Sequence, residues 1–98
     1  MKSILQEDIS VCFICEQNPC GDSLDKHHIF GGASRNKSEK YGLFVYLHHN
    51  RCHIFGKDSA HKNIQVRRKL EELGQKRAMV VYGWTKDEFR KKFYQSYL

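Results

Sequence analysis

Two cysteines separated by two residues, Cys12 and Cys15, form a Cys-x-x-Cys knuckle near the start of the chain. This spacing lets two thiolates converge on one tetrahedral Zn²⁺ ion, with Zn–S distances of about 2.3 Å. A second half-site lies downstream, where Cys52 follows the doublet of His48 and His49. We therefore predict a structural zinc site made of these three cysteines and one histidine, either His48 or His49.

Two alternatives to this zinc site are open. Cys20 has no partner at knuckle spacing, so we interpret it as a free thiol, although its thiolate could replace the histidine. The knuckle could instead be a pair of buried or redox-active thiols, which would make the chain a thiol-disulfide protein. No strand-helix pattern of the thioredoxin type surrounds it, so zinc is the preferred interpretation.

A second group of potential ligands is the doublet His27-His28, followed by His53 and then by His61. Neighbouring residues of a strand point to opposite faces, so His27 and His28 cannot have the same function unless the backbone bends. A neutral imidazole is a good ligand for divalent metals, and its ordinary pKa near 6.5 also suits a general base. One histidine of the doublet can therefore bind a metal while the other activates water.

Two strands and two helices are expected to position these residues. We predict a connector at 16–25, a short strand at 26–30, a polar, glycine-led loop at 31–38, and a half-buried strand at 41–47. The amphipathic pattern of residues 59–73 predicts a helix that Gly74 could end or that resumes through Tyr82. Thr85 and Glu88 have capping-box spacing, which predicts a last helix at about 86–97 with Phe89 and Phe93 facing inward.

The composition limits what the chain can be. Its 98 residues suit one domain, and the 40% of apolar residues is typical of a globular chain. Seventeen Lys and Arg against eleven Asp and Glu give a net charge of +6, which favours partners that carry phosphates. No apolar run approaches a membrane span and no signal-peptide stretch is present, so we expect a cytoplasmic protein.

Together these motifs resemble the HNH nucleases of the ββα-metal class, most closely the small phage-type members. The resemblance rests on DKHHIFGG at residues 25–32, on the strand that leads to Cys52-His53 and on the flanking knuckle halves, and it covers about residues 12–98. It implies an α+β fold with a ββα-metal core, a structural zinc knuckle and C-terminal helices. A single HNH domain would span 1–98, with an N-terminal extension at 1–10, the knuckle and core at 12–64 and a helical part at 65–98.

The resemblance also implies roles for the histidines. His28 matches the general base. His27 and His53 match ligands of one catalytic divalent ion, either Mg²⁺ or a transition metal, and His61 matches a further ligand or a phosphate contact.

The sequence departs from the family pattern at two positions. Cysteine is usual where His48 stands; histidine keeps a zinc-competent donor there but leaves the choice between His48 and His49 open. The strand at 41–47 lacks the asparagine that gives many HNH motifs their middle letter, a role that Asn50 could fill.

Basic residues would supply affinity for a phosphate backbone without reading its base sequence. Arg35, Lys37 and Lys40 flank the glycine-led loop, and Arg35 is the best candidate for a phosphate clamp. A further set lies on the first predicted helix: Lys62, Arg67, Arg68 and Lys69.

We therefore predict a metal-dependent endonuclease that hydrolyses DNA phosphodiester bonds. It would be encoded by a phage or prophage and act in the host cell cytoplasm, alone or beside packaging or recombination proteins. The alternative is a non-catalytic zinc-knuckle protein that binds DNA or assists packaging. Such a protein would have no use for the His27-His28 doublet opposite His53.

Overall fold

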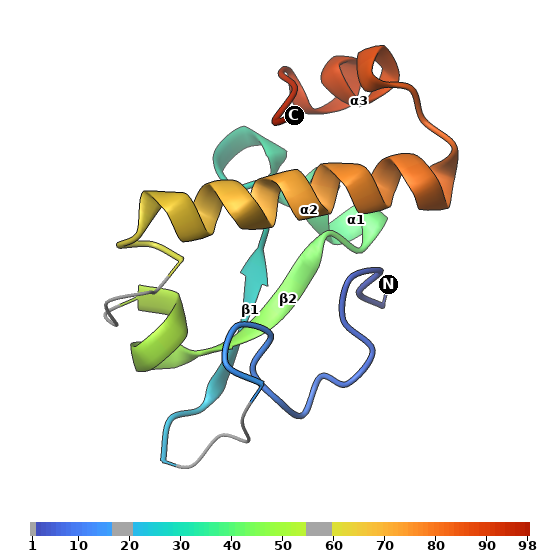
Figure 1. The fold of residues 1–98 in the computed structure, drawn as a ribbon. Coiled ribbons are helices and arrows are strands. Elements are labelled where there is room, and N and C mark those ends of the chain that lie inside the picture. The colour runs from blue at the N-terminus through green and yellow to red at the C-terminus, as the bar shows by residue number, and fades with distance from the viewer. Residues whose placement is uncertain (1, 17–20, 55–59) are drawn as a thin grey trace.

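The computed structural model describes residues 2–16, 21–54 and 60–98. Within them, two strands and three α-helices form a small α+β domain (Figure 1). Cys20 and the start of the helix predicted from residue 59 lie outside the described residues. The elements follow one another as β1 (Leu24–His28), a 3₁₀ turn (Gly32–Ser34), α1 (Arg35–Tyr41), β2 (Phe44–His48), a π-helical turn (His49–Ile54), α2 (Ile64–Tyr82) and α3 (Lys86–Phe93).

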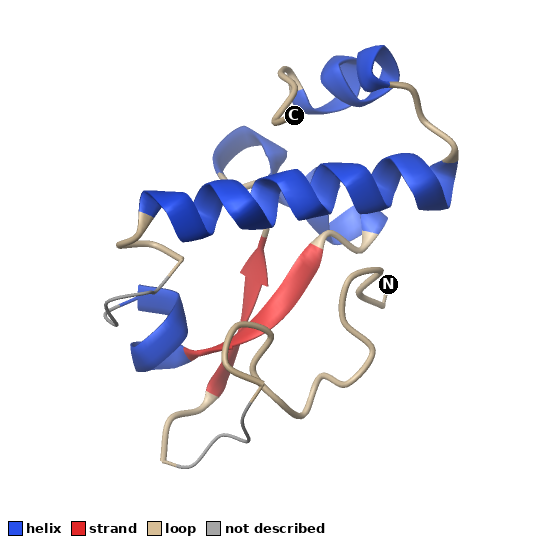
Figure 2. Ribbon diagram, in the orientation of Figure 1, coloured by secondary structure: helices blue, strands red, loops and turns tan. Residues whose placement is uncertain are grey.

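The strands β1 and β2 form an antiparallel pair, drawn in red in Figure 2. His27 lies opposite Val45 in the register, and His28 lies opposite Phe44. Residues directly opposite share a face of the sheet, and neighbours along a strand alternate between faces. His27 and Val45 therefore lie on one face and His28 and Phe44 on the other, as the alternation predicted.

The apolar core joins the hairpin to the helices. Leu47 of β2 and Leu70 of α2 belong to one cluster of buried side chains. Phe30, just beyond β1, packs against Phe89 and Phe93 of α3, with ring centroids 5.4 and 4.9 Å away. Both α3 rings are essentially inaccessible to solvent, which confirms that they face inward.

The prediction of a loop at 31–38 is wrong, because the 3₁₀ turn and the first part of α1 occupy these residues. Ser38 explains the helix. Its buried hydroxyl donates to the Phe30 carbonyl oxygen at 2.8 Å and accepts from the Phe30 N–H at 3.0 Å, which fixes this polar segment against the end of β1. Because α1 runs to Tyr41 and Gly42 ends it, the second strand begins at Phe44 instead of 41.

The first strand is displaced from its predicted range of 26–30 and occupies Leu24–His28. The ladder reaches back into the predicted connector because β2 extends to His48, which lies opposite Leu24. The two strands thus share five paired positions, and Asp25 becomes part of β1.

Helix α2 is continuous from Ile64 to Tyr82, so the alternative in which the helix runs through Tyr82 is confirmed, and Gly74 does not end it. Gly74 lies where Ile29 and Phe30 cross the helix, and a Cβ there would be 2.9 Å from Ile29 Cγ2. Asn63 caps the start of α2, and Gly83, with φ of +67°, ends it. Within the described residues, no helix is both long and apolar enough to cross a membrane.

Helix α3 begins as predicted. The Thr85 hydroxyl accepts from the Glu88 N–H at 3.1 Å, and the Glu88 carboxylate accepts from the Thr85 N–H at 3.2 Å, so the capping box is confirmed. The helix ends at Phe93 instead of 97, because Tyr94 adopts a left-handed backbone with φ of +71°.

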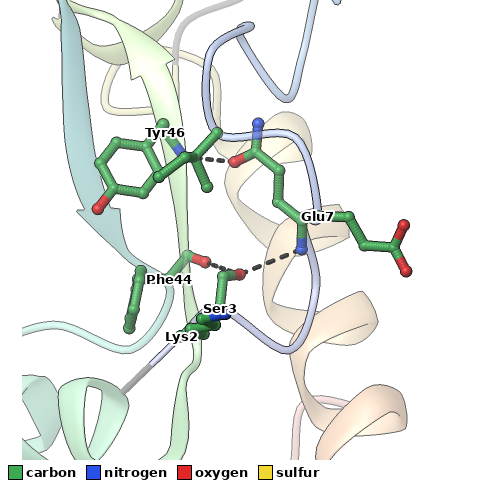
Figure 3. A pocket seen from close by; sticks show the side chains of 7 residues that line it. Lys2, Ser3, Glu7, Phe44 and Tyr46 are labelled. Atoms are coloured by element: carbon green, nitrogen blue, oxygen red, sulfur yellow. Dashed lines mark hydrogen bonds between the residues drawn. The ribbon is translucent and has the colours of Figure 1, made fainter.

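The N-terminal segment runs along the outer edge of β2 and carries the cysteine knuckle. The Ser3 hydroxyl donates to the Phe44 carbonyl oxygen, and the Gln6 side-chain oxygen accepts from the Tyr46 N–H at 2.8 Å (Figure 3). Further along, the Phe13 N–H donates to the Tyr46 carbonyl oxygen at 2.9 Å. These bonds hold the knuckle against β2. The hollow of about 490 Å³ between this segment and β2 is lined by no histidine or cysteine.

Gly42 provides a test of this attachment, because two constraints meet there. Its φ is +72°, and a Cβ would collide with the backbone carbonyl oxygen of Lys2. Gly83 has a similar φ of +67° but open space around its Cα. We expect Gly83→Ala to cost about 1–2 kcal/mol of unfolding free energy for the left-handed backbone alone. Gly42→Ala should cost about 1–3 kcal/mol more for overpacking, as measured by urea unfolding. Equal losses would show that the N-terminal segment does not press on Gly42.

Candidate metal centres

Four ligands of the first centre converge at one end of β2. The donor atoms of Cys12, Cys15, His48 and Cys52 all lie within 4.8 Å of one another. Cys15 Sγ is 3.2 Å from His48 Nδ1, and Cys52 Sγ is 4.0 Å from the same atom. Sulfur and nitrogen ligands of one tetrahedral zinc lie about 3.6–3.8 Å apart, so this set fits a structural zinc ion.

The chemistry of the donor set also fits zinc. Burial, together with the neighbouring Cys12 and Cys15 thiols, raises the pKa of the Cys52 thiol to about 12. Three thiols this close cannot all lose their protons unless a cation compensates the charge, and Zn²⁺ does this at sites of three sulfurs and one nitrogen. A redox pair would require two thiols alone. The third cysteine and the buried His48 thus favour metal binding over thiol-disulfide chemistry.

The structure selects His48 over His49 as the nitrogen ligand. His48 is the last residue of β2 and His49 the first of the π-helical turn, and the two rings have different partners. His48 is fully buried among the cysteines, whereas the partly exposed His49 donates from Nδ1 to the Asp25 carboxylate. Asn50, the suggested substitute for the family asparagine, makes a backbone N–H bond of 2.9 Å to the Asp22 carboxylate.

A second centre is formed by His27, His53 and His61, which come from β1, the π-helical turn and the segment that enters α2. The rings of His27 and His53 have centroids 5.1 Å apart, and those of His53 and His61 are 4.7 Å apart. The Nε2 atoms of His53 and His61 are separated by 3.1 Å. Two nitrogens bound to one ion at about 2.1 Å lie about 3.0–3.4 Å apart, so this spacing fits shared metal ligation.

His27 is the buried member of this cluster. Its Nε2 is the one buried side-chain nitrogen or oxygen without a hydrogen-bond partner in the part of the chain that the structure describes. Burial, followed by the neighbouring His53, His61 and His28, lowers the pKa of His27 to about 3, so the ring is neutral near pH 7. An unprotonated imidazole nitrogen beside two further imidazoles is what a divalent metal requires.

Asp25 orients the second centre, a role that sequence reasoning missed. Its Oδ2 accepts from His53 Nδ1 at 3.1 Å, so the His53 proton lies on Nδ1, and Nε2, which faces His61, keeps a lone pair that can bind a metal. Burial opposes the charge on Asp25, but the hydrogen bonds from His49 and His53 outweigh it and lower its pKa overall. A carboxylate behind a ligating histidine is the usual support of a metal site. The available signal was the position of Asp25 two residues before His27, which puts both on one strand face.

His28 lies outside both ligand clusters but borders the second. Its Nε2 is 3.2 Å from a carboxylate oxygen of Glu39, and its Nδ1 accepts from Arg35 Nε at 3.5 Å. A hollow of about 210 Å³ brings His28 and Arg35 together with the histidine cluster. The other residues that line it are Lys26, His27, Gly31, His53 and His61.

A larger hollow, of about 820 Å³, continues from the same histidines along α2. Arg67 and Arg68 of α2 line it, together with Glu71, Glu72 and the C-terminal residues 95–98. Two hollows therefore meet at these histidines, one also lined by Arg35 and the other by two arginines of α2.

Two of the lysines predicted to contact DNA lie outside these hollows. Lys37 donates to the Lys92 carbonyl oxygen and to the Tyr94 hydroxyl, so it ties α1 to the end of α3. Lys40 lies over the Tyr41 ring, 5.3 Å from its centroid. Their contact with DNA stays a prediction.

The assignment of His48 can be tested against its neighbour. We expect His48→Ala to lose zinc, measured by elemental analysis, because it removes a buried ligand. The binding free energy of a structural zinc is folding free energy, so the melting temperature should fall by roughly 10 °C or more. His49→Ala should keep one tightly held zinc and most of the stability. Zinc loss in His49→Ala alone would overturn the assignment.

Comparisons with protein-family models, with curated proteins and with solved structures found no match to this chain. The described structure contains an antiparallel hairpin followed by a helix, a Cys₃His cluster and a separate histidine cluster. This arrangement is compatible with a ββα-metal nuclease, and both clusters are possible metal sites.

Proposed function

We propose that the chain is an HNH-type endonuclease that hydrolyses DNA phosphodiester bonds, with the hairpin and α2 acting as its ββα-metal core. The observation that carries the proposal is the hollow shared by two kinds of histidine. Three histidines are grouped as metal ligands, and a fourth, His28, faces the same hollow without joining them. Metal-assisted hydrolysis of a phosphodiester uses a cation and a general base that both face the scissile phosphate.

His27, His53 and His61 would hold the catalytic cation, and their three nitrogens favour a transition metal or Zn²⁺ over Mg²⁺, which prefers oxygen ligands. A divalent ion bound there would stabilise negative charge on the phosphate and on the leaving oxygen. Asp25 would keep His53 oriented toward it. The structural zinc would hold the π-helical turn that carries His53.

His28 would act as the general base. It takes one proton from a water molecule while the water oxygen forms a bond to phosphorus and the bond from phosphorus to the 3′ oxygen breaks. The 3′ oxygen then gains a proton from solvent, and His28 returns its proton to solvent. Arg35, next to His28 in the same hollow, is placed to pair with a non-bridging phosphate oxygen.

The basic side chains support DNA as the substrate. Arg35 and Lys26 line one hollow at the histidines. Arg67 and Arg68 line the other, together with Glu71 and Glu72, so a phosphate backbone that follows the two hollows would meet arginine in each. The net charge of +6 adds long-range attraction. These contacts read no bases, so we expect weak sequence specificity.

Cleavage of supercoiled plasmid at low salt, with Mn²⁺, Co²⁺, Ni²⁺ or Mg²⁺ added separately, tests the proposal. We expect metal-dependent nicking that EDTA abolishes. His28→Ala should lower its rate about 10²- to 10⁴-fold, the usual contribution of a general base, while zinc content and catalytic-metal binding persist. His27→Ala should lose both cleavage and the second metal equivalent, measured by calorimetric titration with Mn²⁺. Binding of DNA without cleavage under every metal would instead favour the non-catalytic zinc-knuckle protein.

The phosphate clamp makes a separate prediction. Arg35→Ala should weaken binding of a short duplex and reduce by about one the slope of log affinity against log salt, because one phosphate contact is lost. Lys86→Ala is the matched control. It removes a cation at the start of α3, which follows the end of α2, whereas His61 precedes the start of α2. Figure 1 shows these two ends of α2 at opposite ends of a long helix. Equal effects of the two substitutions, by fluorescence anisotropy, would remove Arg35 from the clamp.

A further inference from the structure

Helix α1 presents two side chains to His28. Arg35 and Glu39 are four residues apart, so they project from the same side of this helix. Arg35 Nε lies 3.5 Å from His28 Nδ1, and Glu39 Oε1 lies 3.2 Å from His28 Nε2. Both ring nitrogens of His28 are therefore engaged by one short helix.

The two contacts require the same tautomer of His28. A carboxylate only accepts hydrogen bonds, so the nitrogen that faces Glu39 must carry a proton. A guanidinium only donates, so the nitrogen that faces Arg35 must offer a lone pair. From this geometry we propose that Glu39 is a positioning residue that holds His28 as its Nε2–H tautomer and leaves Nδ1 as the proton acceptor. The inference deepens the proposed nuclease function and rests on it for the catalytic consequence.

Glu39 is itself held in place as an anion. Lys26 Nζ lies 3.1 and 3.4 Å from the two Glu39 oxygens. The hydrogen bond from His28, and then the one from Lys26, lower the pKa of the Glu39 carboxyl. Lys26 also lies over the Phe44 ring, 4.3 Å from its centroid, and Phe44 is the cross-strand neighbour of His28. Lys26 thus links the carboxylate at His28 Nε2 to Phe44, whose ring centroid lies 6.1 Å from that of His28.

The positions of Arg35 and Glu39 separate their roles. Arg35 lines the hollow that contains the histidine cluster, so Nδ1 faces the place where a phosphate would bind. Glu39 lines neither of the two hollows that meet at the histidines, so it acts through His28 and does not touch substrate. Once the Arg35 N–H turns from His28 Nδ1 to the phosphate, Nδ1 can take a proton from water, and the ring becomes a cation with a proton on each nitrogen. The Glu39 carboxylate then faces that positive charge at Nε2, as the carboxylate of a serine-hydrolase triad does.

The tautomer can be read directly in the full-length, zinc-loaded protein by long-range ¹H–¹⁵N correlation of the His28 ring. We expect a protonated Nε2 and an unprotonated Nδ1 in the wild type. Glu39→Ala should produce a mixture of both tautomers and lower the turnover of plasmid cleavage about 10- to 100-fold, with an unchanged KM. Glu39→Gln, whose amide oxygen can still accept from Nε2–H, should restore most of the wild-type tautomer. Asp87→Ala, which removes an exposed carboxylate paired with Arg90 on α3, is the control and should change neither readout.

The outcomes separate the two proposals. A wild-type His28 with its proton on Nδ1, or a tautomer that Glu39→Ala leaves unchanged, would overturn the role of Glu39 whether or not the protein cuts DNA. A tautomer that responds as expected, in a protein that cleaves no DNA with any metal, would support the coupling of Glu39 to His28 and overturn the nuclease function. A loss of turnover without a change of tautomer would also contradict the proposal.

Discussion

In three places two neighbouring residues point their side chains into different surroundings, and the candidate sites depend on this separation. His27 faces the histidine cluster while His28 faces Glu39, and His48 lies among the cysteines while His49 bonds Asp25. In the π-helical turn, Cys52 belongs to the Cys₃His cluster and His53 to the histidine cluster. Strand alternation produces the first separation. The second falls where β2 passes into the π-helical turn at His49, and the third lies within that turn. A zinc ion that fixes Cys52 would therefore also fix the backbone from which His53 projects.

The N-terminal segment and the helices complete the support of these pairs. Backbone and side-chain bonds to β2 place the knuckle where His48 and Cys52 can meet it. Backbone bonds from Ala60 to Cys52 and from His61 to His53 fold the start of the α2 segment back onto the turn. Because the described residues form two strands and a small core, the fold depends on such cross-links between segments far apart in sequence.

The sequence predicted what is encoded locally. Knuckle spacing identified the cysteines, alternation separated His27 from His28, and Thr85 with Glu88 marked the start of α3. It could not choose between His48 and His49, because that choice depends on which side of β2 the knuckle lies, a tertiary contact made through Phe13.

Helix α1 was missed because a glycine-led polar segment is typical of a loop, and its helical form depends on the bond of Ser38 to Phe30. Glu39 was missed with it. The sequence left open whether Gly74 ends α2, because glycine is common at helix ends, whereas its role here is close packing against Ile29.

One hairpin and the turn that follows it carry two candidate metal centres of different chemistry, and Co²⁺ titration of the metal-free protein would show whether both bind metal. The first equivalent should give the thiolate-to-cobalt charge-transfer absorption of the Cys₃His cluster and restore the fold. A second equivalent should bind at the histidines, change only the cobalt d–d spectrum, and be lost in His27→Ala. Saturation at one equivalent, or a second equivalent that also raises the thiolate absorption, would contradict the account of two separate centres.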